Sequence, residues 1–498
     1  MKNRRYRPLI CAEVVYFLLF IAELTFSVLR SGHHLVYPLD DTYITMAMAK
    51  HFAQHGVWGV TPFAFTSATS TPLYVLLLSA AYCLAGVADW WPMLLAFLAG
   101  AAAIAVANGM LPKAKTPALL ALVLFTPMAT MAHIGMEHTL HCALTLLFAW
   151  RASAAISEPR RMDWLLILLT PALVMTRFEG LFLVGICALL LCIRRSFLLA
   201  IGILAAAIAP VAAYGMISLA NGWFFLPNSL MLKGAKIGLS LLFRPFIVLC
   251  VAPHLLGILA ALAFALWASK ASPAWTRSRV LLWVSLLSLI AHVTLADVGW
   301  IFRYEAYLIA LSVVSLATAL PLIDSTKLRK IAYAIAAAAL LLRSGRAFYE
   351  MPSITAGIYS QQYQMARFVE RYYPGASVAA NDIGAINYRT DLHLFDLVGL
   401  ADPEVLRLKR RKAYTTAAIE AGAIERKVAI AIVYDSWFSD TRPAVFGGPS
   451  LPQSWVRVGR WRTAYGEHLG GDTVSFYAVR PEEENCLRQN LQDFRARP

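Results

Sequence analysis

The chain has 498 residues, of which 59% are hydrophobic and 15% charged, with a mean hydropathy of +0.61 and a formal net charge of +15. Soluble domains carry roughly 25% charged residues, so this composition excludes an ordinary soluble protein and indicates a polytopic membrane protein. Residues 1–343 hold 25 Lys/Arg against 12 Asp/Glu, whereas residues 344–498 hold 19 against 17. The excess positive charge therefore belongs to short loops between apolar segments, where it sets orientation, and not to a face for nucleic acid.

Apolar segments recur along the first 343 residues and predict the membrane-spanning part of the protein. They lie at about 9–29, 71–88, 92–110, 117–132, 138–154, 163–176, 178–193, 196–220, 245–268, 280–296, 303–323 and 329–343. The first segment follows a basic N-terminus and is too long for a signal-peptide core. We therefore interpret it as a retained helix whose N-terminus is cytoplasmic.

The basic residues between these segments indicate which loops are cytoplasmic, because short cytoplasmic loops collect Lys and Arg. Clusters occur at Lys113/Lys115, Arg151/Arg160/Arg161, Arg194/Arg195, Lys270/Arg277/Arg279 and Lys327/Arg329/Lys330. An odd number of crossings must then separate an outer loop at Asp40 from Lys113, although two apolar segments lie between them. We expect segment 71–88 to dip into the membrane or lie along its surface, which leaves about eleven crossings.

The first outer loop, residues 30–71, carries two adjacent aspartates, Asp40 and Asp41. Neighbouring carboxylates beside a bilayer resist desolvation and repel each other, so such a pair usually serves proton transfer, cation binding or substrate orientation. Residues 41–56 form an amphipathic pattern that ends at a glycine. This pattern predicts a short helix on the outer membrane surface, with Asp41 at its N-terminus.

Residues 344–498 have the composition and spacing of a separate, extracytoplasmic α/β domain. The pattern predicts a helix over 355–373 and strands at Ser377–Ala380, Leu394–Leu397, Val428–Tyr434 and Val474–Val479. The residues between the first two strands, Asn381-Asp382-Ile383-Gly384, are typical of a turn closed by an Asx hydrogen bond, with contact to a substrate as the alternative. The expected fold class is thus a polytopic α-helical membrane protein with a C-terminal α/β domain.

Four polar groups lie at helix ends on the outer side, where the aspartate pair is also expected. They are Gly135-Met136-Glu137-His138, Thr176-Arg177-Phe178-Glu179-Gly180, Leu226-Pro227-Asn228-Ser229 with Lys233, and Trp300-Ile301-Phe302-Arg303-Tyr304-Glu305. Each group alone is explained as an interfacial anchor, with snorkelling cations and aromatic residues at the membrane boundary. Their convergence on one side favours a common site.

An aspartate pair with several outward cations suits one class of reaction. Aspartate can accept the proton of a hydroxyl nucleophile, while Lys and Arg can hold a phosphate leaving group. The residues therefore suggest transfer of a sugar from a lipid phosphate to an acceptor. We expect Asp41 to be the base and Asp40 to orient it or the acceptor. Lys233, Arg303 and Arg177 are candidates for the phosphate, and Glu137 and Glu179 for positioning these cations or a sugar hydroxyl.

Metal binding is an alternative at two places. His133, Glu137 and His141 stand at i, i+4 and i+8, which is one face of a helix, and Asp40 with Asp41 could hold a divalent cation. Histidines within transmembrane helices more often bond across helices, and a buried Glu23 in the first segment suits the same packing role. The sequence thus requires no metal or other cofactor, and a divalent cation stays open.

An ordered set of short strings resembles the GT-C-fold membrane glycosyltransferases. The strings are Leu39-Asp40-Asp41-Thr42-Tyr43-Ile44, His55-Gly56-Val57-Trp58, Ser70-Thr71-Pro72-Leu73, the groups at Glu137, Arg177 and Asn228, Asn381-Asp382-Ile383-Gly384-Ala385, and Asp396-Leu397-Val398-Gly399-Leu400. Within the fold they look most like bacterial relatives of the mycobacterial terminal arabinofuranosyltransferases, and more distantly like protein O-mannosyltransferases and lipid A aminoarabinose transferases. The family often has Arg-Pro-Glu-Gly where this chain has Arg177-Phe178-Glu179-Gly180.

The resemblance implies an inverting transferase in the bacterial plasma membrane that uses a polyprenyl-phosphate sugar on the outer face. By motif position, Asp40 or Asp41 would be the base, and His55 and Asn228 would belong to the substrate site. The acceptor would be a cell-envelope glycan, a lipid or a protein, and the other partners would be membrane lipids, with no nucleic acid. Two alternatives stay open: a transporter or flippase of a lipid-linked sugar, and a non-catalytic envelope assembly protein.

Overall fold

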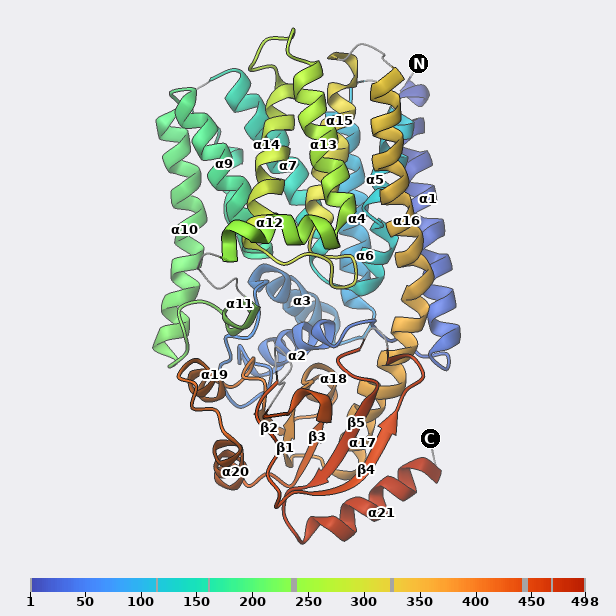
Figure 1. The fold of residues 1–498 in the computed structure, drawn as a ribbon, viewed down its shortest axis with the longest axis vertical. Helices are drawn as coiled ribbons and strands as arrows, with labels where there is room; N and C mark the ends of the chain where they lie inside the picture. The colour runs from blue at the N-terminus through green and yellow to red at the C-terminus, as the bar shows by residue number, and fades with distance from the viewer. Residues whose placement is uncertain are drawn as a thin grey trace.

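A bundle of long helices forms one part of the molecule, and a small α/β domain lies at one end of it (Figure 1). The structure is a computed structural model that describes residues 2–112, 115–159, 162–233, 240–322, 327–440, 447–466 and 469–496. The bundle consists of α1 (Lys2–Arg30), α4 (Trp91–Met110), α5 (Lys115–Phe125), α6 (Met128–Ile134), α7 (His138–Ser157), α8 (Trp164–Thr176), α9 (Gly180–Ile193), α10 (Phe197–Ala220), α12 (Ser240–Val251), α13 (Pro253–Ala268), α14 (Arg277–Leu295), α15 (Ala306–Ala319) and α16 (Lys327–Ile358).

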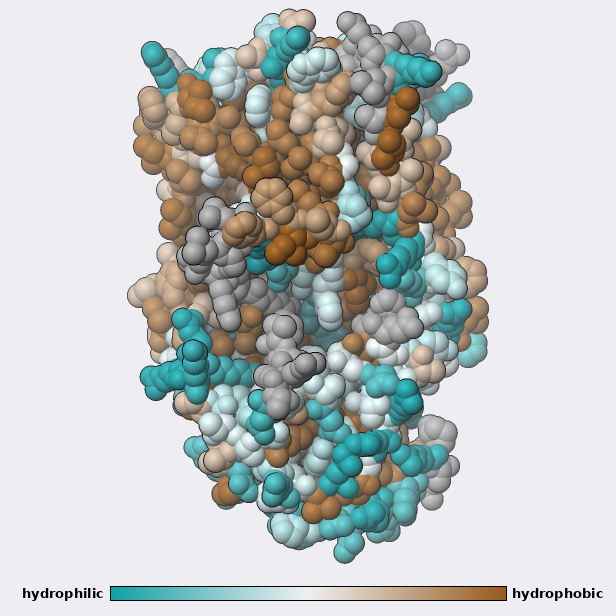
Figure 2. All heavy atoms as spheres, in the orientation of Figure 1, coloured by the Kyte–Doolittle hydropathy of each residue, from teal (hydrophilic) through white to brown (hydrophobic). Residues whose placement is uncertain are grey.

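The bundle has the length and hydropathy of a multi-pass membrane domain. In the described ranges, five helices are long and apolar enough to cross a membrane, and two bent helix pairs raise that number to seven. The shorter α8, α9 and α15 and the long α16 run alongside them (Figure 1), so about eleven crossings stay the expectation. Figure 2 shows hydrophobic side chains over the bundle and hydrophilic ones at its far end and over the α/β domain.

Two predicted spans are broken by proline. Segment 245–268 is not one straight helix, because α12 and α13 meet at an angle of 110°. Pro253 begins α13, and the residue before it, Ala252, leaves the helical region at φ −127°, as the residue before a proline tends to do. Segment 117–132 bends by 42° between α5 and α6, where Pro127 precedes the second helix.

Two short helices lie between the bundle and the α/β domain. The predicted surface helix is present as α2 (Asp40–His55), and segment 71–88 is α3 (Pro72–Ala85), which packs against α2 below the bundle. Most of α2 is buried, because α3 covers one side and α18 (Gly384–Arg389) of the C-terminal domain covers the other (Figure 1). The expectation that α2 lies open on the membrane surface was therefore wrong.

The C-terminal domain is a five-stranded sheet with helices around it. Its elements are α17 (Gln364–Tyr372), β1 (Ser377–Ala380), α18, β2 (His393–Asp396), α19 (Pro403–Arg410), α20 (Thr416–Glu425), β3 (Ile430–Val433), β4 (Val456–Arg462), β5 (Thr473–Ala478) and α21 (Glu483–Ala496). The strand order is β2-β1-β3-β5-β4, with β1 parallel to β2 and β3, and β5 antiparallel to β3 and β4.

The predicted strands are present within a residue or two, but β4 was missed. Its sequence carries three arginines and a glycine, and it is largely exposed at the sheet edge, so it lacks the apolar run of a buried strand. The predicted boundary between residues 343 and 344 lies inside α16, which continues to Ile358 and ends in a π-helical turn at Tyr359–Tyr363. One continuous core joins both parts, and it includes Tyr43 of α2 and Ile386 of α18.

Candidate active site

The two adjacent aspartates at the start of α2 have different surroundings. Asp40 is half-buried, and its two carboxylate oxygens accept hydrogen bonds from the backbone N–H groups of Gly384, at 2.6 Å, and Ala385, at 2.8 Å. These groups open α18, whose N-terminus carries partial positive charge. Asp40 therefore links the C-terminal domain to α2, and both of its carboxylate oxygens are already hydrogen-bonded within the protein.

The ionisation of Asp40 reflects a balance of opposing effects. Burial raises its pKa from the usual 3.8 to about 8, and the carboxylate of Asp382 adds to this rise, whereas the two backbone N–H groups lower it. Burial likewise raises the pKa of Asp382. The carboxyls of Asp40 and Asp382 form an interacting pair, so their protons are shared by the pair.

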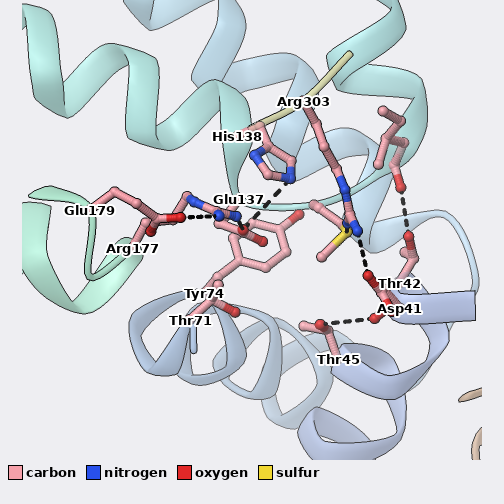
Figure 3. Close-up of polar contacts among 12 residues, drawn as sticks. Asp41, Thr42, Thr45, Thr71, Tyr74, Glu137, His138, Arg177, Glu179 and Arg303 are labelled. Carbon is pink, nitrogen blue, oxygen red and sulfur yellow. Dashed lines mark hydrogen bonds and ion pairs between the residues drawn. The ribbon is translucent and has the colours of Figure 1, made fainter. Parts of the chain in front are cut away.

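Asp41 lines a cavity of about 300 Å³ between α2 and the bundle. Its carboxylate forms an ion pair with Nη2 of Arg303 (Figure 3). The Asp41 side chain is 33% exposed and the Arg303 side chain 1% exposed, so a buried guanidinium faces a carboxylate at the cavity edge.

A second ionic group forms the opposite wall of this cavity. Arg177 donates from Nη1 to Glu137, at 2.6 Å, and from Nη2 to Glu179, at 2.5 Å (Figure 3). Arg177 and Glu179 lie in the turn between α8 and α9, and Glu137 directly precedes α7. Two carboxylates share one guanidinium here, so the loss of Arg177 would leave two buried or half-buried acidic groups without a cation.

The two arginines converge on the ring of Tyr304. The guanidinium carbons of Arg177 and Arg303 lie 5.5 Å and 5.1 Å from the centre of that ring. In the described part of the chain, the Nε–H groups of both arginines are buried without a hydrogen-bond partner. Unpaired buried donors are costly, so both arginines are incompletely paired within the described residues.

An unusual loop presents Arg303 to the cavity. Trp300, Ile301 and Phe302 have φ of 39°, 57° and 62°, in the left-handed region that side chains other than glycine rarely adopt. Glu305 supports the loop by accepting from the backbone N–H of Gly299 at 2.8 Å and from Arg343 at 2.6 Å. Such strain persists where the surroundings enforce it, and this loop directs Arg303 toward Asp41.

Glu137 reaches the cavity because the chain breaks between α6 and α7. Gly135 ends α6 with φ +70°, and a Cβ atom there would lie 2.3 Å from the ring of Tyr37. The predicted metal face of His133, Glu137 and His141 was therefore wrong, since the three residues do not share one continuous helix. Among the described residues, no group of three or more His, Cys, Asp or Glu could hold a metal ion.

The histidines of that predicted face serve packing. His133 lies 2.9 Å from the carboxylate of Glu23, which also accepts from Thr130 at 2.7 Å, so the expected packing role of Glu23 is confirmed. The ring of His141 packs against that of Tyr307, at 4.4 Å between ring centres and with the two planes tilted by 42°.

Two predicted site residues, His55 and Asn228, do not line the first cavity in the described structure. His55 ends α2 and is exposed, because the helix runs away from its N-terminal aspartates. Asn228 is buried and donates to the carbonyl of Gly399 at 2.8 Å, so it holds α11 (Asn228–Lys233) against the C-terminal domain, while its neighbour Ser229 lines the cavity. Lys233 ends α11, and its side chain lies outside the described part.

A second cavity has a volume of about 410 Å³, and part of its lining consists of residues that the sequence did not single out. It adjoins the first, shares Asp41 and Tyr304 with it, and is closed by the C-terminal domain through Gln362, Asp382 and Trp437 among others. Asp382 was a candidate for substrate contact, but Gln362 belongs to a helical segment without a recognisable motif. Gln362 is recognised only in the structure, by its position in the π-helical turn Tyr359–Tyr363.

Comparisons with known proteins agree with this architecture. A sequence family described as a domain of unknown function, DUF8728, matches residues 353–477. No curated protein sequence matches the chain. ArnT from Cupriavidus metallidurans bound to undecaprenyl phosphate has a TM-score of 0.56 at 13% identity, over 95% of this chain and 98% of that chain.

Two further solved structures are similar to the chain. The apo state of the same ArnT has a TM-score of 0.51 at 12% identity, over 94% of this chain and 98% of that chain. The arabinofuranosyltransferase AftD from Mycobacteria has a TM-score of 0.46 at 15% identity, over 95% of this chain and 40% of that chain. The likeness to ArnT over nearly the whole length of both chains shows that this protein has the GT-C fold of multi-pass membrane proteins.

Proposed function

We propose that the protein is an integral-membrane glycosyltransferase that moves a sugar from a polyprenyl-phosphate donor to a hydroxyl acceptor with inversion. The observation that carries this proposal is the first cavity, where the carboxylate of Asp41 faces two buried guanidiniums, Arg177 and Arg303, with unpartnered Nε–H groups. A base and an anion-binding wall in one cavity are the two parts that this reaction needs.

The likeness in fold supports a lipid phosphate as the donor. ArnT, which has the same fold over nearly the same length, was solved bound to undecaprenyl phosphate. In the present chain, the phosphate of a similar lipid would lie against Arg303 and Arg177, with Lys233 as a further candidate cation. The lipid chain would reach the bilayer between the apolar helices of the bundle.

The reaction follows from the positions of these groups. The acceptor oxygen attacks the anomeric carbon on the face opposite the phosphate, and its proton passes to Asp41. The bond between the anomeric carbon and the phosphate oxygen breaks, and its electrons stay on the phosphate. Arg303 and Arg177 stabilise the charge that develops there. Attack from the opposite face inverts the configuration of the sugar.

Because Asp41 is paired with Arg303, its availability as a base would depend on whether the donor is bound. Without substrate, the guanidinium of Arg303 is bonded to the carboxylate of Asp41. A donor phosphate would compete for the same guanidinium and release the carboxylate to accept the proton of the acceptor hydroxyl. Asp41 would therefore be activated when the leaving group is in place. The reaction is assigned to the outer face of the plasma membrane, with the C-terminal domain outside and the N-terminus in the cytoplasm.

The test is transfer from a radiolabelled polyprenyl-phosphate sugar in membranes that contain each variant. Asp41→Asn is expected to reduce the rate about 10²- to 10⁴-fold, as the loss of a general base does. Asp40→Asn is expected to reduce it less and chiefly through a weaker attachment of α18. Asp435→Asn is the control, because this carboxylate belongs to the C-terminal domain and lines neither cavity. Normal turnover by both Asp40→Asn and Asp41→Asn would refute the mechanism.

A further inference from the structure

The second cavity differs from the first in its charge. It is lined by five aspartates, Asp40, Asp41, Asp297, Asp382 and Asp396, and by one arginine, Arg244, among the described residues. Arg244 is already bonded to Asp297 at 2.5 Å and to the carbonyl of Ala296 at 2.9 Å. An anion would meet five carboxyl groups and one arginine here, against four carboxyl groups and two arginines in the first cavity, so the electrostatics disfavour an anion more strongly in the second cavity.

Two buried amides beside this cavity have unused hydrogen-bonding groups. Gln362 donates from Nε2 to Asp382, at 2.8 Å, and to Tyr434, which leaves its Oε1 without a partner in the described structure. Asn381 accepts from the backbone N–H of Tyr434 at 3.0 Å, and its Nδ2 has no partner in the same residues. The side chains of Gln362 and Asn381 are only 2% and 6% exposed.

The orientation of these amides follows from the groups that they bond. Nε2 of Gln362 must face the carboxylate of Asp382, and Oδ1 of Asn381 must face a backbone N–H. One free acceptor and one free donor therefore remain beside the same cavity. Sugar hydroxyl groups both donate and accept, so a hydroxyl-rich ligand satisfies both atoms.

A network behind the cavity holds Asp382 and Gln362 in place. The Tyr434 hydroxyl lies 2.9 Å from Oδ2 of Asp382 and 2.6 Å from Oε1 of Gln361. Gln361 and Gln362 sit in the π-helical turn Tyr359–Tyr363 that ends α16. Such turns are frequent at functional sites, because the extra residue redirects side chains. Here the turn brings Gln362 to the cavity, while Gln361 packs behind it.

Aromatic side chains complete the wall. Trp300, Tyr304 and Trp437 line the cavity together with aliphatic residues such as Val398 and Leu400. An aromatic face packs against the apolar C–H face of a sugar ring, while the polar groups bond the hydroxyls at the ring edge.

We propose that the second cavity is the binding site of a hydroxyl-rich glycan acceptor without negative charge, and that Gln362, Asn381 and Asp382 of the C-terminal region hold its hydroxyl groups. This inference rests on the proposed function and names the acceptor class for the same site. Asp41 lies in both cavities. An acceptor hydroxyl bound in the second cavity would therefore face the proposed base, with the donor in the first.

The test measures binding of three matched probes to the full-length protein in lipid nanodiscs. The probes are a neutral octyl glycoside, its amino-sugar counterpart and its phosphate ester. We expect the neutral probe and the amino-sugar probe to bind, and the phosphate ester to bind at least about tenfold more weakly than the neutral probe because of the carboxylates. Tighter binding of the phosphate ester than of the neutral probe, or no binding of the neutral probe, would overturn the proposal.

Matched variants locate the site. Gln362→Met is expected to weaken binding of the neutral probe about three- to tenfold, the effect of losing one or two hydrogen bonds. Gln489→Met replaces an exposed glutamine of α21, far from the residues that line the cavity, and should leave binding within about twofold of the original. Asp382→Asn keeps the shape of the side chain and should also weaken binding. Equal affinities for the Gln362→Met and Gln489→Met variants would contradict the assignment.

A separate measurement distinguishes this inference from the proposed function. Undecaprenyl phosphate binding should be unchanged in the Gln362→Met and Asp382→Asn variants, because both residues line only the second cavity. Loss of glycoside binding with intact lipid-phosphate binding supports the acceptor site. Absence of lipid-phosphate binding in the unmodified protein would refute the donor assignment and leave the glycoside result to stand by itself.

Discussion

Asp41 and Arg303 form an ion pair at the edge of the first cavity, although 262 positions separate them in the chain. The pair joins the start of α2 to the left-handed loop before α15. It places a carboxylate and a buried guanidinium on either side of the space where the proposed donor and acceptor would meet. Substituting either partner therefore tests a different half of the reaction.

Replacing Arg303 should weaken donor binding. Arg303→Gln removes the charge, and we expect undecaprenyl phosphate affinity to fall about ten- to hundredfold, as the loss of charge-assisted hydrogen bonds does. Arg303→Lys should recover part of it, because lysine keeps the charge without the planar fork. Binding to the full chain in nanodiscs is the measurement. Arg346→Gln, at an exposed arginine of α16, is the control, and equal affinities for Arg303→Gln and this control would contradict the assignment.

The contact between α2 and α18 leaves no space for a side chain at Gly384. A Cβ atom there would lie 2.1 Å from the backbone oxygen of Asp40 and 2.8 Å from its carboxyl group. Gly384→Ala should therefore destabilise the protein by about 1–3 kcal/mol and reduce transfer, because the two parts must separate. Thermal unfolding of the purified full chain checks this. Gly345→Ala, where no atom lies within 4 Å, should leave the unfolding temperature unchanged or slightly raised.

The contribution of Asp40 to the stability of the protein should fall as pH rises from about 4 to about 8. The pKa of Asp40 is raised by burial to about 8, and that of Asp382 is raised in the same direction. The folded state then holds more protons than the unfolded state between the two pKa values of Asp40, so raising the pH favours unfolding. Asp40→Asn should flatten this slope, because an amide does not titrate in this range.

Thermal unfolding of the original protein and of Asp40→Asn between pH 5 and 9 measures the slope. The variant loses one backbone hydrogen bond, since its amide can accept from only one of the N–H groups of Gly384 and Ala385. Its unfolding temperature should therefore be lower at acidic pH and less dependent on pH. Parallel curves would show that Asp40 stays ionised in the folded state.

The orientation in the membrane can be tested with reporters. A reporter fused at position 62, in the loop after α2, and one at position 400, in the C-terminal domain, should both report the outside. One at position 114, beside the basic residues that precede α5, should report the cytoplasm. If positions 62 and 114 fall on the same side, α3 is a true crossing and the predicted topology is wrong.

Much of the architecture could be predicted because it depends on local patterns. Hydropathy located the helices of the bundle, and the spacing of apolar residues located β1 and β3. The alternation of basic and non-basic loops depends only on the order of the loops along the chain. It correctly predicted that Glu137, Arg177 and Arg303 lie on the same side as Asp41. Breaks within helices were less predictable. Gly135 ends α6, whereas other glycines lie inside helices, so a glycine by itself does not predict where a helix ends.

What the sequence by itself determined is therefore a multi-pass helical protein whose polar groups meet at one end. What only the tertiary structure decided is the division between Asp40 and Asp41. The two side chains leave α2 about 100° apart, so neighbours in sequence face different partners. Asp40 meets the N-terminus of α18, 344 residues away, and Asp41 meets Arg303 and the cavity. These contacts depend on how elements that are distant in the sequence pack together. The residues next to Asp40 and Asp41 in the sequence carry no information about that packing.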